Sequence, residues 1–310
     1  MASLHEIPLE RRTLHGHFSR DLAPVLTIEP GDSVQFATID SGWGLEGGPA
    51  ETRARFGPRD PELDSGHALI GPIEVRAARA GQTLAVRIDD LRVGPYGFTD
   101  AGGWKSWLNT RLGFDDGVTR YHSWELDADG LTGRDQAGHV VELRPFLGVM
   151  GMPPPERGIH STVPPRVWGG NLDCAELVAG TTLFLPIPVD GARFSAGDGH
   201  ARQGDGEVCQ LAIECPMEHA RLTLDVRDDM PLRTPVAWTP EAWVVLGLDE
   251  DLDEAAALAV DAMLDVMGRE LALDRLDAYA LASVVVDLHV TQVVNGVKGV
   301  HALLRHDAIR

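Results

Sequence analysis

The sequence predicts a mainly β protein of the α+β class, with sandwich- or barrel-like β units and a few helices in the C-terminal third. Glycine and proline are abundant, at 34 and 20 residues, and they separate short apolar runs, as turns separate strands. Extended helical spacing of apolar residues appears only late in the chain. At about 150 residues per domain, the 310 residues fit two domains or one large β-rich unit.

A glycine followed by alternating apolar and β-branched residues occurs three times, and this pattern is typical of a strand that starts after a turn. The three copies begin at Gly31, Gly81 and Gly180. A repeated β unit and a chance likeness between strand starts both explain the recurrence.

Two β-rich parts are expected, residues 1–145 and 146–310. Between about 92 and 143 the alternation weakens and glycine, aspartate and tryptophan are scattered, so we expect an irregular insertion or lid, which in a long connection is often functional. Prolines at 153–155 and 164–165 exclude a helix just after the boundary.

Helices are predicted at about 252–283. From Leu252 the apolar residues keep helical spacing, and acidic residues precede them, where they complement the helix dipole. A second helix is expected from Arg275 to about Ser283, with Asp274 as its cap. The valine-rich residues 284–294 that follow predict a strand.

The net charge of −20, from 27 basic and 47 acidic residues, argues against a nucleic-acid or anionic-membrane partner, because both require a basic face. The three cysteines do not form a disulfide framework. No secretory leader is visible, and no apolar run is long enough to cross a bilayer. We therefore expect a cytoplasmic protein.

Two common hydrolase motifs are missing from the sequence. It contains no G-x-S-x-G nucleophile elbow and no H-E-x-x-H zinc motif. The glycine-rich run from Gly197 fails as a dinucleotide-binding loop, because Arg202 stands at the third glycine position. The acidic residues in this run would also repel a pyrophosphate, so the run suits a cation better.

The densest group of candidate functional residues is Gly197–Glu207, which contains Asp198, His200 and Glu207. Their side chains offer oxygen and nitrogen ligands for a metal. Apolar runs at 182–189 and 208–213 flank the segment, so we expect a strand–loop–strand unit that aims these side chains at one place. A solvated, turn-rich hairpin is the alternative.

Weaker candidates lie elsewhere. Asn171 and Asp173 are two residues apart and would face the same side of an extended segment, although an Asx turn also explains them. His67 precedes a strand and fits either a metal ligand or a structural histidine. Asp40 ends an apolar run, where it fits a ligand or a turn cap.

Over nearly its full length the chain resembles the acetamidase/formamidase family. The segments that carry the resemblance are HALIGPIEV (67–75), PFLGVMGMPP (145–154), TVPPRVWGGNLD (162–173), the run from Gly180 to Glu218 and DLHVTQVVNGVKGVHALL (287–304). The resemblance implies hydrolysis of a small amide to carboxylate and ammonia. It also implies a β-rich homo-oligomer with a bound divalent metal, for which we expect zinc, with calcium as the alternative.

The resemblance also implies roles for individual residues. The candidate metal ligands are Asp40, His67, Asp173 and His200. Glu207 is expected to act as general acid and base, and Asp198 to orient His200 or to bind the metal itself. Asn171 is expected to hydrogen-bond the substrate amide. Trp168 departs from the family pattern, in which a polar residue is frequent at this place, and if it lines the pocket we expect an acyl group larger than acetyl.

Two other functions remain open at this point. A lactamase that opens cyclic amides could use the same site, and its reaction would release no ammonia. A non-enzymatic β-module that binds calcium would use oxygen ligands only and would not need His67 or His200.

Overall fold

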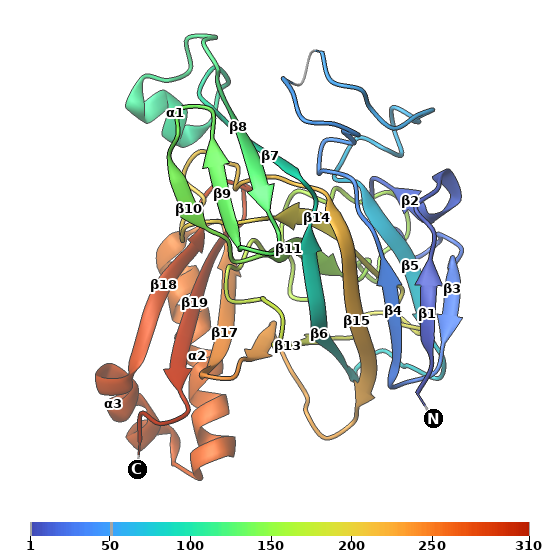
Figure 1. Ribbon diagram of the computed structural model, residues 1–310. Helices are drawn as coiled ribbons and strands as arrows, with labels where there is room; N and C mark the ends of the chain where they lie inside the picture. Colours follow the sequence, from blue (N-terminus) through green and yellow to red (C-terminus); the bar gives the residue numbers. More distant parts are fainter. Residues whose placement is uncertain (1, 50–51, 310) are drawn as a thin grey trace.

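The computed structural model describes residues 2–49 and 52–309 and is built mainly from three β-sheets (Figure 1). The largest sheet contains, in spatial order, β1 (Leu4–Ile7), β4 (Asp32–Phe36), β15 (Met217–Arg227), β6 (Thr83–Val93), β13 (Thr182–Pro186), β16 (Val236–Trp238), β17 (Ala242–Asp249), β19 (Lys298–Arg305) and β18 (Val286–Gln292). The second contains β12 (Gly169–Asn171), β11 (Phe146–Gly151), β14 (Phe194–His200), β5 (Leu69–Val75) and β2 (Leu14–His15), with β3 (Leu26–Ile28) paired to β5.

The third sheet contains β10 (Val140–Glu142), β9 (Thr132–Asp135), β8 (Arg120–Asp127) and β7 (Tyr96–Ala101). The helical elements are η1 (Arg11–Thr13), α1 (Trp107–Leu112), α2 (Leu252–Leu271) and α3 (Arg275–Val285). The prediction of a mainly β fold with helices late in the chain is confirmed.

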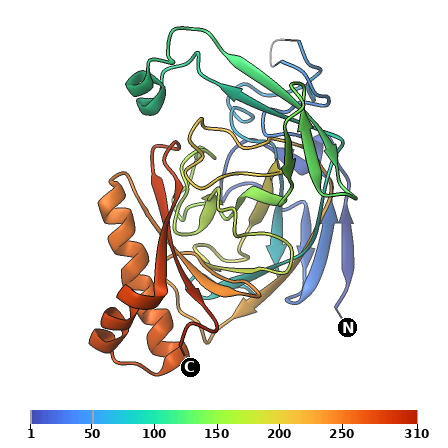
Figure 2. The same ribbon diagram turned by 60° about the vertical axis from the view of Figure 1, so that its left-hand side comes forward.

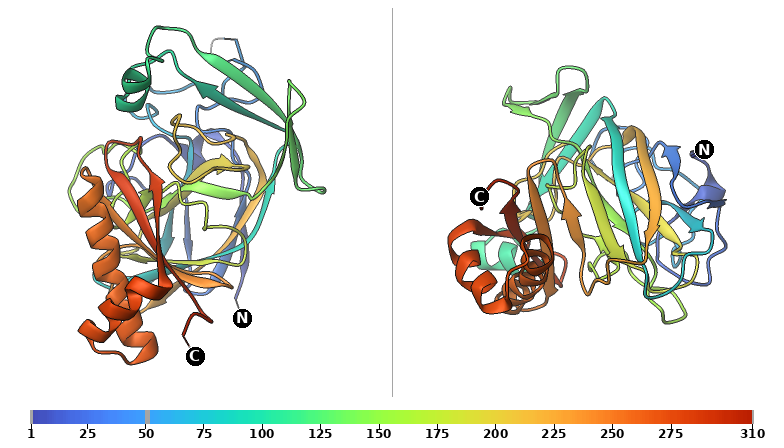
Figure 3. Two further views of the ribbon diagram at one scale, coloured as in Figure 1. Left: turned by 90° about the vertical axis from the view of Figure 1, so that its left-hand side faces the viewer. Right: turned by 90° about the horizontal axis from the view of Figure 1, so that it is seen from below.

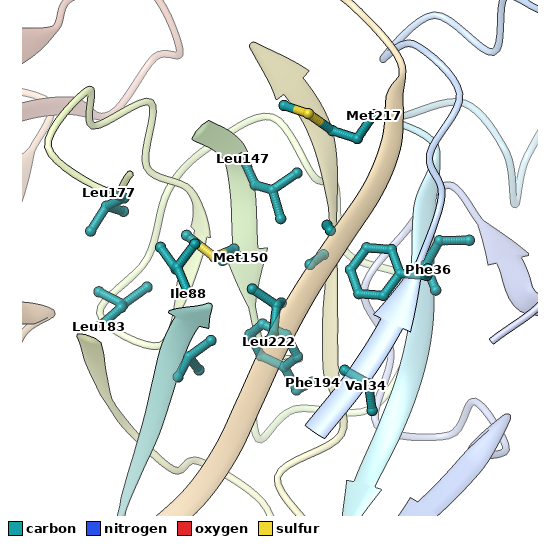
Figure 4. Packing of buried hydrophobic residues seen from close by; sticks show 14 of the residues in the cluster. Val34, Phe36, Ile88, Leu147, Met150, Leu177, Leu183, Phe194, Met217 and Leu222 are labelled. Carbon is teal, nitrogen blue, oxygen red and sulfur yellow. The ribbon is translucent and has the colours of Figure 1, made fainter. Parts of the chain in front are cut away.

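The two larger sheets pack face to face as a sandwich. Val34 of β4 and Leu222 of β15 come from one sheet, and Leu147 and Phe194, from β11 and β14, come from the other (Figure 4). All four side chains are almost fully buried. Strands from both sides of residue 145 pair in each of these sheets, so the sandwich is assembled from both halves of the sequence.

A second apolar core lies between the largest sheet and the helices. Alternate residues of β17 face opposite sides: Val244 and Leu246 belong to the sandwich core, whereas Val245 belongs to the helix-covered core. The helices α2 and α3 cover this outer face (Figure 2). No helix in the described residues is long and apolar enough to span a bilayer.

Both late helices begin where the sequence predicts. The carboxylates of Asp251 and Asp274 accept hydrogen bonds from backbone N–H groups of the first turns of α2 and α3. The predicted strand at 284–294 begins late, however, because Val284 and Val285 continue α3. The local helix outweighs the β preference of these two valines, and β18 starts at Val286.

Residues 92–143 were expected to be irregular, but they hold the whole third sheet, from β7 to β10, together with α1. The sheet projects from the sandwich (Figure 3). Its strands carry few fully buried residues; in β8 only Leu126 is buried. Their apolar alternation is therefore weak, which explains why the sequence pattern did not reveal them.

Candidate active site

The strand β14 carries Asp198 and His200 into the interior of the sandwich. All seven of its residues are buried. An added Cβ at Gly199 would come within 2.5 Å of the Cys215 carbonyl oxygen, so neighbouring main chain closes the face opposite the two ligand-type side chains. The segment 197–207 was expected to be a loop, but its first half is this strand. Its expected second strand, 208–213, is loop.

A second acidic residue, Glu214, joins this pair, and the sequence analysis missed it. The Nε2 atom of His200 lies 3.1 Å from Glu214 Oε1 and 3.4 Å from Asp198 Oδ1. Glu214 also accepts hydrogen bonds from Ser41 Oγ at 2.8 Å and from the Ala212 N–H at 3.1 Å. The available signal was a carboxylate between two apolar residues, Ile213 and Cys215, since a buried carboxylate needs partners.

Two loops complete the site. Asp173 follows β12, and Glu207 lies in the loop after β14; both have a φ of +46°, in the left-handed region. Asn295 donates from Nδ2 to Asp173 Oδ2 at 2.6 Å, and Gln203 donates to the Asp173 carbonyl at 2.7 Å. One potential ligand atom from each of Asp173, His200 and Glu207 lies within 4.8 Å of the others, and Asp198, His200 and Glu214 form a similar group. His200 is common to both groups.

Burial and mutual charge set the protonation of these side chains. Burial tends to lower the pKa of His200, but the Glu214 and Asp198 carboxylates outweigh it and raise this pKa well above its ordinary value. Burial also tends to raise the pKa of Asp198, but His200 and His67 lower it to about 2. These shifts favour a protonated His200 imidazole paired with an ionised Asp198 carboxylate on β14.

The loop carboxylates shift in the opposite direction. Burial raises the pKa of Asp173 to about 8 even though His200 opposes it. Burial, followed by the nearby Asp173 carboxylate, raises the pKa of Glu207 well above its usual range. Two buried carboxylates side by side resist holding two negative charges, and a positive ion between them would relieve that repulsion.

Three buried ligand-type atoms in this centre have no hydrogen-bond partner: Asp173 Oδ1, His200 Nδ1 and Glu207 Oε2. Main chain borders them at Gly148 of β11, where an added Cβ would come 2.5 Å from Asp198 Oδ2, 2.7 Å from Asp173 Oδ1 and 2.8 Å from His200 Cε1. These oxygen and nitrogen atoms lack partners, and the space beside them at Gly148 is too small for a Cβ atom. Such an arrangement fits a bound divalent cation.

The other predicted residues lie outside the two groups. His67 accepts or donates a hydrogen bond between Nδ1 and Thr162 Oγ1, at 2.7 Å. Its charge nevertheless reaches Asp198. Asp40 is fully buried, 3.2 Å from Arg53 Nη1, and accepts a hydrogen bond from the Gly44 N–H at 2.9 Å.

The two predicted substrate contacts lie at the two ends of β12: Trp168 directly precedes the strand, and Asn171 is its last residue. Asn171 donates from Nδ2 to the Val163 carbonyl at 3.0 Å, while its buried Oδ1 has no partner. Trp168 is half-buried just before the strand, where its carbonyl accepts a hydrogen bond from the Met152 N–H at 3.2 Å. Their contact with a substrate stays a prediction.

Known proteins show similarity along most of the chain. It is 26% identical over 252 residues to the acetamidase of Mycolicibacterium smegmatis, which covers 63% of this chain and 61% of that protein. The chain thus matches only about three-fifths of this relative's length. A solved structure of an acetamidase from Bacillus halodurans aligns over 96% of this chain and 97% of its own, with 28% identity and a TM-score of 0.82.

The fold extends to a more distant protein, a gamma lactamase from Delftia acidovorans, with a TM-score of 0.64 and 19% identity over 99% of this chain and 93% of that one. At this identity the likeness shows the fold alone. The model of the Acetamidase/Formamidase family matches residues 4–161 and 156–304. The chain therefore belongs to the Acetamidase/Formamidase family.

Proposed function

We propose that this protein is a metal-dependent hydrolase that cleaves the C–N bond of small linear carboxylic amides to carboxylate and ammonia. The observation that carries the proposal is the set of unpartnered atoms on Asp173, His200 and Glu207 in one buried centre. The names of the relatives, acetamidase among them, supply the substrate class.

Asp173 and His200 are the proposed principal ligands. His200 would ligate through Nδ1 as a neutral imidazole, so metal binding would displace the proton that its carboxylate neighbours otherwise stabilise. Asp198 and Glu214, beside His200, would orient its ring or act as further ligands. His67 remains a candidate because its charge reaches Asp198. Asp40 is left out of the proposed ligand set because Arg53 and Gly44 hold its carboxylate.

Mixed nitrogen and oxygen donors favour zinc, and calcium is the alternative. A divalent ion there would polarise an amide carbonyl and lower the pKa of water.

Side chains near the proposed metal would transfer protons and bind the substrate. Glu207 would take the proton from an attacking water and return one to the departing ammonia. Its burial keeps bulk water away from that proton transfer. The free Oδ1 of Asn171 would accept a hydrogen bond from the substrate N–H. Trp168, three residues earlier, would border the acyl group and limit its size.

Metal removal gives the direct test. Chelator treatment should abolish ammonia release from formamide and acetamide, and adding back Zn²⁺ should restore it. The same samples should be analysed for metal content. Full activity in a verified metal-free sample would contradict the proposal. Opening of a lactam without ammonia release from linear amides would instead establish the cyclic-amide alternative.

We also propose a homo-oligomer. The helix α3 and the edge strand β18 expose large apolar side chains, at 75% for Leu276, 59% for Tyr279, 79% for Val284 and 51% for Leu288. A sheet edge flanked by exposed apolar residues is suited to pairing. Light scattering after size exclusion should give a mass above 33.5 kDa, and a monomer at micromolar concentration would contradict this.

A cytoplasmic location, with neither nucleic acid nor membrane as a partner, is part of the same proposal. All three cysteines are free thiols, which fits a reducing compartment, and the net charge is −20. Cell fractionation that recovered the protein with membranes or with nucleic acid would contradict it.

A further inference from the structure

A second group of ligand-type side chains lies where the loop after β14 meets the C-terminal sheet. His289 of β18 and His301 of β19 are directly opposed in the antiparallel register, so their side chains lie on one face of the sheet. Their rings stack in parallel, with centroids 4.9 Å apart and an angle of 2° between the planes. The strand pairing thus presents two imidazoles side by side.

The loop adds a carboxylate to this pair. Asp205 Oδ2 lies 2.9 Å from His289 Nδ1. Backbone hydrogen bonds hold the loop against β18: the Gly206 N–H donates to the Thr291 carbonyl at 3.0 Å, and the Val293 N–H donates to the Gly206 carbonyl at 3.2 Å. One potential ligand atom from each of Asp205, His289 and His301 lies within 4.8 Å of the other two.

An ion pair between Asp205 and His289 leaves part of this arrangement unexplained. His301 is fully buried, and its Nε2 atom has no hydrogen-bond partner. Its Nδ1 atom lies 2.9 Å from Thr291 Oγ1. When Nδ1 donates to that hydroxyl, Nε2 presents a lone pair, which is how a second hydrogen bond fixes a metal-ligating imidazole.

The surrounding charges suit a cation. Burial lowers the pKa of His301 to about 4, so its ring is neutral and able to ligate near neutral pH. The Glu176 carboxylate, which is paired with Arg144, lies close enough to both histidines to interact with them electrostatically. The side chains of Asp205 and His289 are 36% and 39% exposed, which gives an ion access from solvent.

We propose that Asp205, His289 and His301 form a second binding site for a divalent transition metal such as Zn²⁺, separate from the Asp173–His200–Glu207 centre. Two imidazoles and one carboxylate are a common donor set for such ions. The site would clamp the loop that carries Glu207 to β18 and β19. It does not depend on the amide-hydrolase proposal, because its test counts bound metal rather than turnover.

The test is Zn²⁺ stoichiometry after chelator stripping, measured by equilibrium dialysis and elemental analysis. Asp205→Asn and His289→Ala should each bind one equivalent less than the unmodified protein. His219→Ala is the matched control, since His219 lies in a similar half-exposed pair with Asp90, at 2.6 Å, that belongs to none of the three ligand groups found in the described residues. It should keep the full equivalent count.

Two further measurements separate the sites and the effects of folding. Asp173→Asn, which alters the central group alone, should retain the Zn²⁺ that depends on Asp205 and His289. Circular dichroism should show that the two half-exposed substitutions leave the fold unchanged. If Asp205→Asn and His289→Ala bind as many equivalents as the unmodified protein, the group is an ion pair beside a buried histidine, and the proposal is overturned.

Discussion

The two sides of the candidate active site are built differently. On one side, Asp198 and His200 lie on β14, which is paired to β11 and β5 along both edges. On the other, Glu207 lies on a loop in which its own backbone bonds are local, from its N–H to the Gly204 carbonyl at 3.2 Å and from the Gln210 N–H to its carbonyl at 2.9 Å. The strand fixes groups that must hold charge in place, whereas the loop carries the group proposed to move protons. Substitutions on the strand side should therefore lower metal content and stability, whereas substitutions on the loop side should lower turnover.

The largest effect is expected from His200→Gln. This change removes the imidazole that lies between the Asp198 and Glu214 carboxylates, and breaking a buried pair in this way costs about 3–5 kcal/mol. It also removes a proposed ligand. We expect loss of metal, loss of ammonia release and a lower melting temperature together. Normal metal content with normal stability would show that the strand side is not the charged framework described here.

Glu207→Gln tests the loop side. We expect kcat to fall by about 10²- to 10⁴-fold, as for removal of a general acid–base group, while metal content and melting temperature stay close to those of the unmodified protein. Glu218→Gln is the control, because Glu218 pairs with Arg92 at the surface. Unchanged turnover in Glu207→Gln would remove this residue from the proton-transfer role.

A pair of glycine substitutions compares the two sides directly. Gly148→Ala would force a methyl group against Asp198, Asp173 and His200, so we expect at least a tenfold loss in kcat/KM and weaker metal binding. Gly204→Ala, in the loop, would meet no atom within 4 Å and should change kcat/KM by less than twofold. Equal effects of the two substitutions would contradict the contrast between strand and loop.

The smallest expected effect concerns stability at low pH on the strand side. His15 contacts Ser195 of β14 at 2.9 Å, and burial lowers its pKa to about 4. The unfolded chain binds this proton near pH 6.5, so the free energy of unfolding should fall as the pH drops from 6.5 to 4, by up to about 3 kcal/mol. Urea unfolding of the unmodified protein and of His15→Asn should show this pH-dependent difference, and parallel curves would contradict it.

The sequence was informative where ligand-type side chains alternate with glycines that the backbone packing requires. Asp198 and His200 stand out because glycines alternate with them, and those glycines are needed where neighbouring main chain passes close to β14. The same glycines made the segment resemble a loop. Its strand character comes from pairing with β11 and β5, which are distant in sequence, and local pattern does not record such pairing.

Other parts of the site depended on tertiary contacts alone. Glu214 reaches His200 only because the chain returns beside β14 after a long loop. Asp40 was predicted as a metal ligand; its carboxylate lies 3.2 Å from Arg53, and nothing in the spacing of the two residues indicates that pair. The third sheet was missed because strands with one sparsely covered face lack strong apolar alternation.

Glu214 is also where the projecting sheet meets the interior. Its backbone exchanges hydrogen bonds with Phe98 of β7, at 2.9 Å in both directions, while its side chain touches His200. One residue therefore links the projecting sheet to the buried His200 imidazole. A shift of β7 relative to the sandwich would therefore displace the main chain of Glu214, the residue whose carboxylate contacts His200.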